Sequence, residues 1–154
     1  IYIGLQNIKS NACELINLKS VEEQNIKSRS KKCIKGDVLL GRLRPNLNKV
    51  CVVDLDFAIC SSEIFVLRPH NLKHSYTLWA YLSSERIQKY FESSALGSTL
   101  PRVSAESVMN LKISQKHFNL LSRRDEKIRN KLDDIKNLQA EFEKLKNELA
   151  KLKN

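Results

Sequence analysis

The chain has 154 residues and a mass of 17.7 kDa, which suits one ordinary globular domain or a smaller domain with a long appendage, but not two full domains. Its 42% hydrophobic and 29% charged residues are typical of a folded protein, and no apolar run of 18 residues is present that would cross a bilayer. The chain begins at Ile1 with neither a Met nor a signal-peptide pattern, so we expect a cytoplasmic piece of a longer gene product.

The formal net charge of +10 points to a polyanionic partner. Up to Ile113 the chain holds 16 basic and 10 acidic residues, and the remainder holds 11 and 7, so the excess is not confined to a tail. The alternative is that surplus lysine serves general solubility.

In the first half of the chain, apolar runs between turn residues predict strands. The alternation of Ile1, Ile3 and Leu5 predicts an opening strand, and residues 15–21 a weaker one. A polar connection is expected over residues 22–35. Three further strands are then predicted at 38–43, 50–53 and 57–67.

Residues 75–91 change to a helical period, and Ser83 to Glu85 resembles a new helix start, so two short helices in tandem are predicted. The aromatic residues at helical spacing there are assigned to the core rather than to base stacking. A loop follows at 97–103, Ser104 can cap a single turn ending at Met109, and residues 111–113 are expected to form a last strand.

The C-terminal stretch carries apolar residues at alternating steps of three and four, which predicts a coiled-coil helix. We call these six positions the seam: Ile135, Leu138, Phe142, Leu145, Leu149 and Leu152. Because no Gly or Pro follows Pro101, we expect the helix to start near Phe118 and to run for some 35 residues, or about 50 Å. Leu120 and Leu132 are expected to lie against the globular part.

Charges beside the seam bear on its partner. Acidic residues lie on one flank, at Asp134, Glu141 and Glu148, while Lys146 and Lys153 lie on the other. This pattern suits a parallel self-pair, or an antiparallel pair with a different helix. Each such charge pair is worth only about 0.2 to 0.5 kcal/mol, so burial of the apolar seam can override the preference.

Motifs for catalysis are mostly absent from the sequence. The four cysteines, Cys13, Cys33, Cys51 and Cys60, match no zinc spacing and are read as reduced thiols. A metal-dependent nuclease would need clustered carboxylates and a lysine, and the nearest pattern, at residues 125–127, falls on the predicted helix. We therefore predict no metal, no cofactor bound by this chain and no catalytic residue.

A proline-broken loop carries the strongest candidate chemistry. Arg42, Arg44, Asn46 and Lys49 project close together there, and arginine and asparagine can pair bidentately with guanine and adenine edges. The same donor logic applies to Ser98, Thr99 and Arg102 in the second loop, and Lys31 and Lys32 suit phosphate contacts. The alternative is that Arg42 and Arg44 pair with acidic residues at a sheet edge.

In their order, these segments resemble the specificity subunit of type I restriction-modification (R-M) systems. The matching segments are YIGLQNI (2–8), GDVLLGRLRPNLNK (36–49), ICSSEIFVLRP (59–69), YTLWAYLSSERIQKYF (76–91) and GSTLPRVS (97–104), followed by the terminal helix. The resemblance implies an α+β target recognition domain at residues 1–114 and a helical spacer at residues 115–154. It also implies either a fragment of a two-domain subunit or a natural half-subunit that dimerises.

The resemblance further implies sequence-specific binding of double-stranded DNA, with one half of a bipartite target read by this chain. The implied partners are methyltransferase and restriction subunits, and a second copy or second half of the specificity subunit that pairs through the helix. S-adenosylmethionine is expected on the methyltransferase subunit. The alternative function is a coiled-coil interaction or scaffold protein with a basic globular head.

Overall fold

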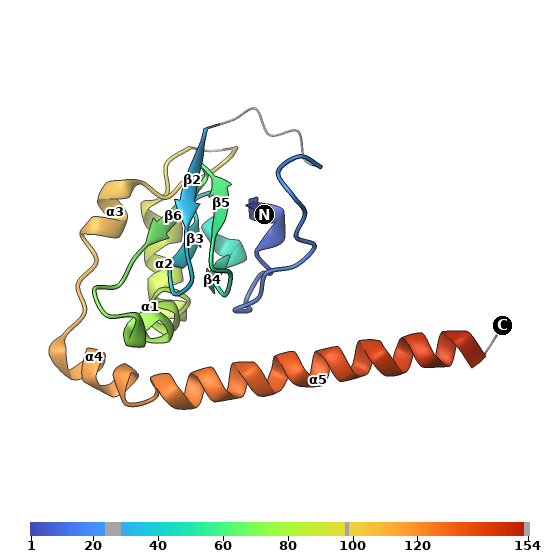
Figure 1. Cartoon of the computed structure of the whole chain (residues 1–154). Helices are drawn as coiled ribbons and strands as arrows, with labels where there is room; N and C mark the ends of the chain where they lie inside the picture. Colours follow the sequence, from blue (N-terminus) through green and yellow to red (C-terminus); the bar gives the residue numbers. More distant parts are fainter. Residues whose placement is uncertain (24–28, 98, 153–154) are drawn as a thin grey trace.

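The structure, a computed structural model, describes residues 1–23, 29–97 and 99–152. Two three-stranded sheets lie at the centre of the part we call the head, residues 1–114 (Figure 1). One sheet has the order β1-β5-β2, with β1 (Tyr2–Ile3) parallel to β5 (Ala58–Ser61) and β2 (Ser30–Cys33) antiparallel to it. The other sheet has the order β4-β3-β6 and is antiparallel throughout, from β3 (Val38–Gly41), β4 (Val50–Val52) and β6 (Ile64–Leu67).

Helices complete the chain. Three short 3-10 turns, η1 (Leu5–Asn7), η2 (Pro45–Leu47) and η3 (Leu72–His74), connect the strands. The α-helices are α1 (Ser75–Leu82), α2 (Glu85–Ser94), α3 (Ala105–Met109), α4 (Gln115–Ser122) and α5 (Asp125–Leu152). Together these elements confirm the predicted α+β class with a long terminal helix.

The core lies between the sheets and the tandem helices α1 and α2. All four residues of β3 are buried, since it is the central strand of its sheet. The aromatic residues of the tandem helices pack inward as predicted: Tyr81 and Phe91 are buried, and the Nε1 of the half-buried Trp79 donates to the Val50 carbonyl at 3.1 Å.

Several sequence expectations for the strands were wrong. Residues 15–21 form only isolated bridges, at Leu15 and Lys19, rather than a strand. The polar segment 30–33, expected as connection, is strand β2, because its pairing with β5 and not its own hydrophobicity sets its structure. Residues 57–67 contain two strands, β5 and β6, which belong to different sheets, and residues 111–113 are irregular.

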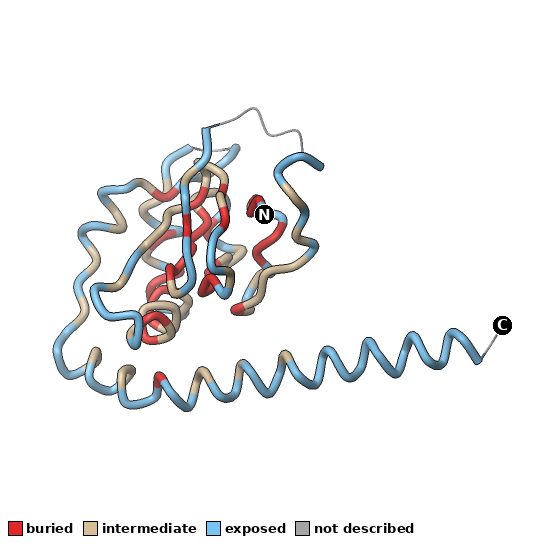
Figure 2. The backbone as a smooth tube through the Cα atoms, in the orientation of Figure 1, coloured by how far each residue is buried: buried red, intermediate tan, exposed pale blue. Residues whose placement is uncertain are grey.

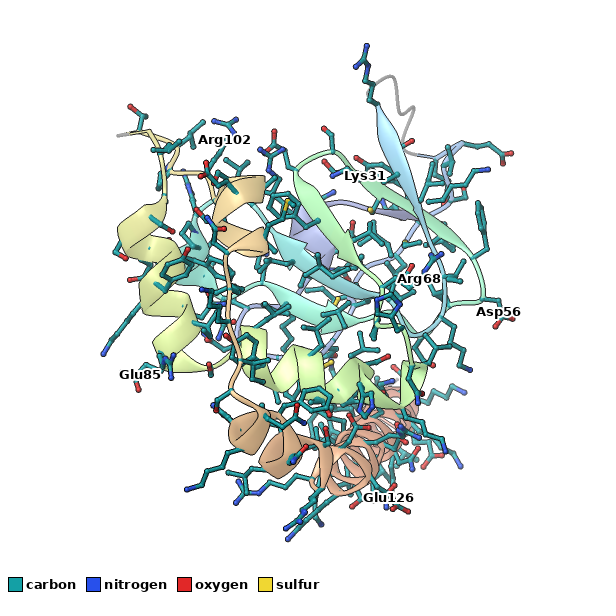
Figure 3. The ribbon with its side chains drawn as sticks, turned by 90° about the vertical axis from the view of Figure 1, so that its left-hand side faces the viewer. Lys31, Asp56, Arg68, Glu85, Arg102 and Glu126 are labelled. Carbon is teal, nitrogen blue, oxygen red and sulfur yellow. The ribbon has the colours of Figure 1, made fainter. Side chains whose placement is uncertain are left out.

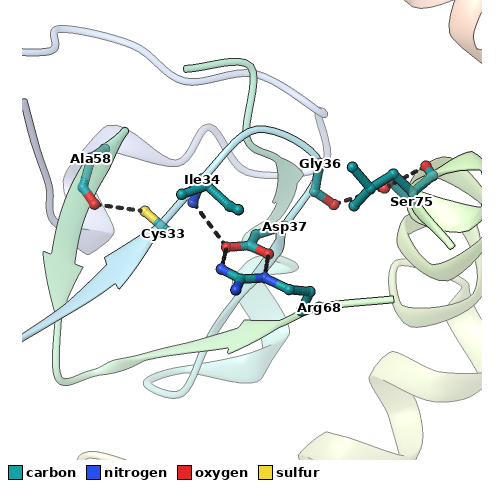
Figure 4. A network of polar contacts seen from close by, with 8 residues as sticks. Cys33, Ile34, Gly36, Asp37, Ala58, Arg68 and Ser75 are labelled. Atoms are coloured by element: carbon teal, nitrogen blue, oxygen red, sulfur yellow. Dashed lines mark hydrogen bonds and ion pairs between the residues drawn. The ribbon is translucent and has the colours of Figure 1, made fainter. Parts of the chain in front are cut away.

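An ion pair joins a buried carboxylate just before β3 to a half-exposed arginine just after β6. Asp37 is fully buried and accepts two hydrogen bonds from Arg68, at 2.7 and 2.8 Å, and one from the backbone N–H of Ile34 at 2.9 Å (Figure 4). These bonds satisfy a carboxylate that would otherwise be costly to bury. Close by, the hydroxyl of Ser75 donates to the Gly36 carbonyl at 2.7 Å and ties α1 to the same turn (Figure 4).

The long helix begins later than the sequence predicts. A break at Arg123 and Arg124 separates α4 from α5, so the rod has 28 residues, or about 42 Å, instead of about 50 Å. The reason is the buried Asp125, the first residue of α5, which accepts hydrogen bonds from Thr77 of α1. Leu132 packs against the core as expected, whereas Leu120 is 48% exposed.

Beyond its docked first turns, α5 extends past the head into solvent (Figure 1). Figure 2 shows it exposed along nearly its whole length, with a buried residue at its start. The last contact with the head that involves an ion pair is between Lys136 Nζ and Asp54 Oδ2, at 2.8 Å. Within the described ranges, no helix combines the length and apolarity needed to span a membrane.

Candidate nucleic-acid interface

Two loops that are far apart in the sequence lie side by side at the candidate site. The backbone N–H of Arg44 donates to the Pro101 carbonyl, and that of Val103 donates to the Arg42 carbonyl, both at 2.9 Å. Leu43 and Arg102 form an antiparallel bridge between the two segments. Three arginines, Arg42, Arg44 and Arg102, therefore come from adjoining stretches of backbone, and we call them the arginine surface.

The first loop has a strained backbone that its surroundings hold in place. Arg44, which precedes Pro45, has a φ of 50°, and Asn48 has a φ of 45°. This left-handed conformation costs Arg44 about 1–2 kcal/mol and costs Asn48 less, because asparagine tolerates it. The Asn48 amide side chain donates to the Ser83 carbonyl at 3.0 Å, and η2 lies between the two strained residues, so the turn is fixed by contacts with the helical layer. Strain held by surrounding contacts is typical of functional loops.

Within the arginine surface, the three side chains differ in their surroundings. The Arg42 Cζ lies 5.0 Å from the centroid of the Phe65 ring, a cation–π distance. The Arg102 Nε lies 3.4 Å from Glu63 Oε2 in a loose, solvent-exposed ion pair. Arg44 is exposed. Among the described residues, neither Arg42 nor Arg44 has an acidic partner, which was the alternative explanation for these arginines.

Arg102 lies at the end of the head away from α5. Figure 3 places Arg102 and Lys31 toward one end of the sheets and Glu126 of α5 at the other. Exposed Asn46 and Thr99 lie in the two loops and add hydrogen-bonding groups.

Two predicted lysines are placed away from the arginine surface. The Lys49 ammonium points inward and donates to the carbonyls of Leu5 and Ile8, both at 2.7 Å, and burial lowers its pKa. It therefore ties the N-terminal segment to β4. Lys32 is exposed on the face of β2 opposite to that of Lys31, because side chains alternate along a strand.

Lys31 is close to the surface but is already engaged. Its ammonium donates to the carbonyls of Ser62 and Ile64, at 3.2 and 2.7 Å, and lies 5.6 Å from the Phe65 ring centroid. It contributes positive potential while holding the connection between β5 and β6. Ser98, also predicted to bind DNA, lies outside the described residues.

Sequence reasoning did not find Phe65 and Glu63, which support two of the three arginines. Both residues lie in or just before β6, where they read as ordinary strand and turn residues. Their role depends on the pairing of β3 with β6, which places Leu40 opposite Phe65. A local pattern carries no signal for such a cross-strand contact.

A bound metal ion needs a set of ligating side chains that lie close together. No group of three or more metal-ligating side chains occurs within residues 1–23, 29–97 and 99–152. In the nearest nuclease-like pattern, at residues 125–127, Asp125 is 5% exposed and its carboxylate accepts hydrogen bonds from Thr77 and from Arg129. These bonds hold it in a structural role.

The seam forms a second candidate interface. All six of its apolar side chains are exposed, from 50% at Ile135 to 84% at Leu152. Exposed leucines in such regular order are unusual on a protein surface and are typical of a helix that pairs with another. Their placement is consistent with the predicted helix pairing.

Comparisons with known proteins give matches among solved structures. No protein-family model matches the chain, and no curated protein matches it. A chain from a structure described as the structural basis of complex assembly and conformational transition of the type I R-M system superposes with a TM-score of 0.65 and 25% sequence identity. The match covers 93% of this chain but 39% of the other, so the chain spans about two fifths of the length of that protein. The present chain is thus similar, over nearly its whole length, to part of a protein of a type I R-M system.

Proposed function

We propose that this chain is a non-catalytic, sequence-specific DNA-binding module of the specificity-subunit type, which reads one half of a bipartite target through the arginine surface. The observation that carries this proposal is that main-chain hydrogen bonds from Arg44 to Pro101 and from Val103 to Arg42 join the two arginine-bearing loops, some 60 residues apart. The similarity to a protein of a type I R-M system supports it.

The helix has a separate role in this proposal. Residues 1–114 form the recognition domain, and residues 115–154 form the spacer that pairs with a second half or second copy through the seam. A rod of about 42 Å exceeds one helical turn of B-DNA, about 34 Å, and so suits two half-sites separated by a gap. Apolar burial along the seam supplies the association energy.

The remaining steps belong to other subunits. Methyltransferase subunits, which bind S-adenosylmethionine, and restriction subunits would dock on the assembled specificity subunit in the cytoplasm and supply the chemistry. This chain would contribute recognition and spacing, in keeping with a site made of hydrogen-bond donors without a catalytic group.

Salt-dependent DNA binding tests the proposal directly. The chain is titrated with a randomised duplex pool, and the bound fraction is sequenced to find an enriched motif. Affinity for that motif and for a scrambled duplex is then measured from 50 to 200 mM salt. We expect affinity to fall steeply with salt and a preference for the motif to persist. Arg44→Ala should weaken binding, and Lys144→Ala on the distal part of α5 should not. If the unmodified chain shows neither salt-dependent affinity nor a preference for the enriched motif, the proposal is overturned.

The seam also favours a second function, that of a coiled-coil scaffold protein. Its six exposed apolar side chains would associate with another helix whether or not the head binds DNA. A scaffold would show association through the seam and no sequence preference in the same titration.

A further inference from the structure

One aromatic ring in the head is shared by two basic side chains from different strands. Phe65, in β6, is half-buried. Arg42 Cζ lies 5.0 Å from its centroid and Lys31 Nζ lies 5.6 Å from it. Arg42 immediately follows β3, and Lys31 belongs to β2 of the other sheet. Two positively charged side chains, one from each sheet region, therefore lie beside the same ring.

The backbone of Arg42 is fixed more firmly than that of an ordinary loop arginine. Its N–H donates to the Glu63 carbonyl and its carbonyl accepts from the Val103 N–H, both at 2.9 Å. Its Nε is buried and has no hydrogen-bond partner among the described residues, so this guanidinium nitrogen is shielded from solvent before any ligand binds. By contrast, Arg44 is exposed and Arg102 is held loosely by Glu63.

We propose that Phe65 is a positioning residue for Arg42: it holds the guanidinium in one orientation, so that Arg42 determines base specificity while Arg44 serves affinity. The inference rests on the proposed function and deepens it. A bidentate contact with a guanine edge requires a planar fork at a fixed angle, whereas a phosphate can be bound by a freely rotating cation. Lys31 cannot take the specifying role, because two carbonyls already engage its ammonium.

The expected effect of removing the ring is a loss of preorganisation. If the Arg42 side chain must be ordered on binding, the protein binds the selected duplex more weakly, by about two- to tenfold, because the guanine contact needs a fixed angle. The contact with phosphate needs no such angle, so the dependence of binding on salt should not change. The ratio of affinities for selected and scrambled duplexes is therefore the quantity to measure.

The test uses the full chain and a pool of duplexes randomised over 24 base pairs. The duplex enriched by the unmodified chain and its scrambled version are then titrated at one salt concentration. We expect Phe65→Leu to lower the selected-to-scrambled ratio two- to tenfold with an unchanged salt slope, and Phe65→Tyr, which keeps the ring, to restore the ratio. Phe57→Leu, the same change at an exposed ring just before β5, is the matched control and should have no effect.

A double-mutant cycle shows whether Phe65 acts through Arg42. Arg42→Lys keeps the charge and removes the fork, so it should lower the ratio by itself. Phe65→Leu should then add no further loss. If Phe65→Leu shows no cooperative transition in a thermal melt, it is replaced by Phe65→Met, which fills a similar volume without a ring.

The outcomes separate the inference from the proposed function. Enrichment of no motif by the unmodified chain would overturn both. Enrichment of a motif together with an unchanged ratio in Phe65→Leu would overturn the inference and leave the proposed function intact. A loss in Phe65→Leu that Phe65→Tyr does not restore, or that adds fully to the loss in Arg42→Lys, would also overturn it.

Discussion

The Asp125 carboxylate, at the start of α5, accepts hydrogen bonds from the backbone N–H and the hydroxyl of Thr77 in α1, at 2.6 and 2.8 Å. Thr77 is the third residue of α1, so its N–H has no partner within its own helix. One buried carboxylate thus lies at the N-termini of two helices, where both helix dipoles stabilise negative charge. This contact ties the start of the long helix to the head.

Removal of this carboxylate should loosen the junction. Asp125→Ala leaves the buried N–H and hydroxyl of Thr77 without an acceptor, so we expect a loss of about 1–3 kcal/mol in the free energy of unfolding by urea. Asp134→Ala, an exposed change on the same helix, should alter it by less than about 0.5 kcal/mol. Equal effects of the two variants would show that the contact contributes nothing.

The buried Asp37 should be the most sensitive polar residue of the head. Asp37→Ala deprives the Ile34 N–H of its acceptor and Arg68 of its partner, and we expect a loss of about 1–3 kcal/mol in chemical unfolding. Arg68→Gln should destabilise in the same direction. The prediction fails if Asp37→Ala is no less stable than Glu92→Ala, a change of an exposed acidic residue on α2.

Stability should fall in alkaline solution because of a buried thiol. Burial raises the pKa of Cys13 from 9.0 to about 11. Between these values the folded state holds a proton that the unfolded state releases, so this contribution is present below pH 9 and is lost as the pH rises toward 11. The loss should reach roughly 2–3 kcal/mol. Unfolding curves from pH 7 to 10.5 should show a shallower decline for Cys13→Ala than for the unmodified chain, and parallel declines would contradict the assignment.

Self-association should depend on the seam alone. Leu145→Asp places a charge in the apolar stripe and should reduce any dimer observed by sedimentation equilibrium to monomer. Because Leu145 is 56% exposed in the single chain, the thermal unfolding of the variant should scarcely differ from that of the unmodified chain. Lys144→Glu, one residue away and outside the seam, should leave the dimer intact, and a monomer produced by both variants would point to a general charge effect.

The sequence predicted elements whose stability is local. The tandem helices begin and end close to their expected residues, because the new helix start at Ser84 and Glu85 depends on neighbouring residues. The cap of α3 at Ser104 is local in the same way. The Ser104 hydroxyl accepts from the Ser107 N–H at 2.9 Å. The seam was predicted because its period is a local property of one helix.

The features that the sequence did not predict depend on contacts between residues far apart in the chain. Strand β2 is a polar segment, and only its pairing with β5 reveals it. The break before α5 depends on Thr77, 48 residues away. Lys49 is indistinguishable from a DNA-binding lysine in sequence, yet the N-terminal segment folds over it and supplies two carbonyl acceptors. DNA binding by the predicted site residues stays a prediction.

The long helix is held at one end by Asp125, Leu132 and Lys136 and extends past the head beyond them. The part after Lys136 is about 24 Å long, so a tilt of about 10° moves its tip by roughly 4 Å, about one base-pair step of 3.4 Å. The angular stiffness of these contacts, more than the count of residues in α5, would then set the tolerance for insertions or deletions in a gapped target.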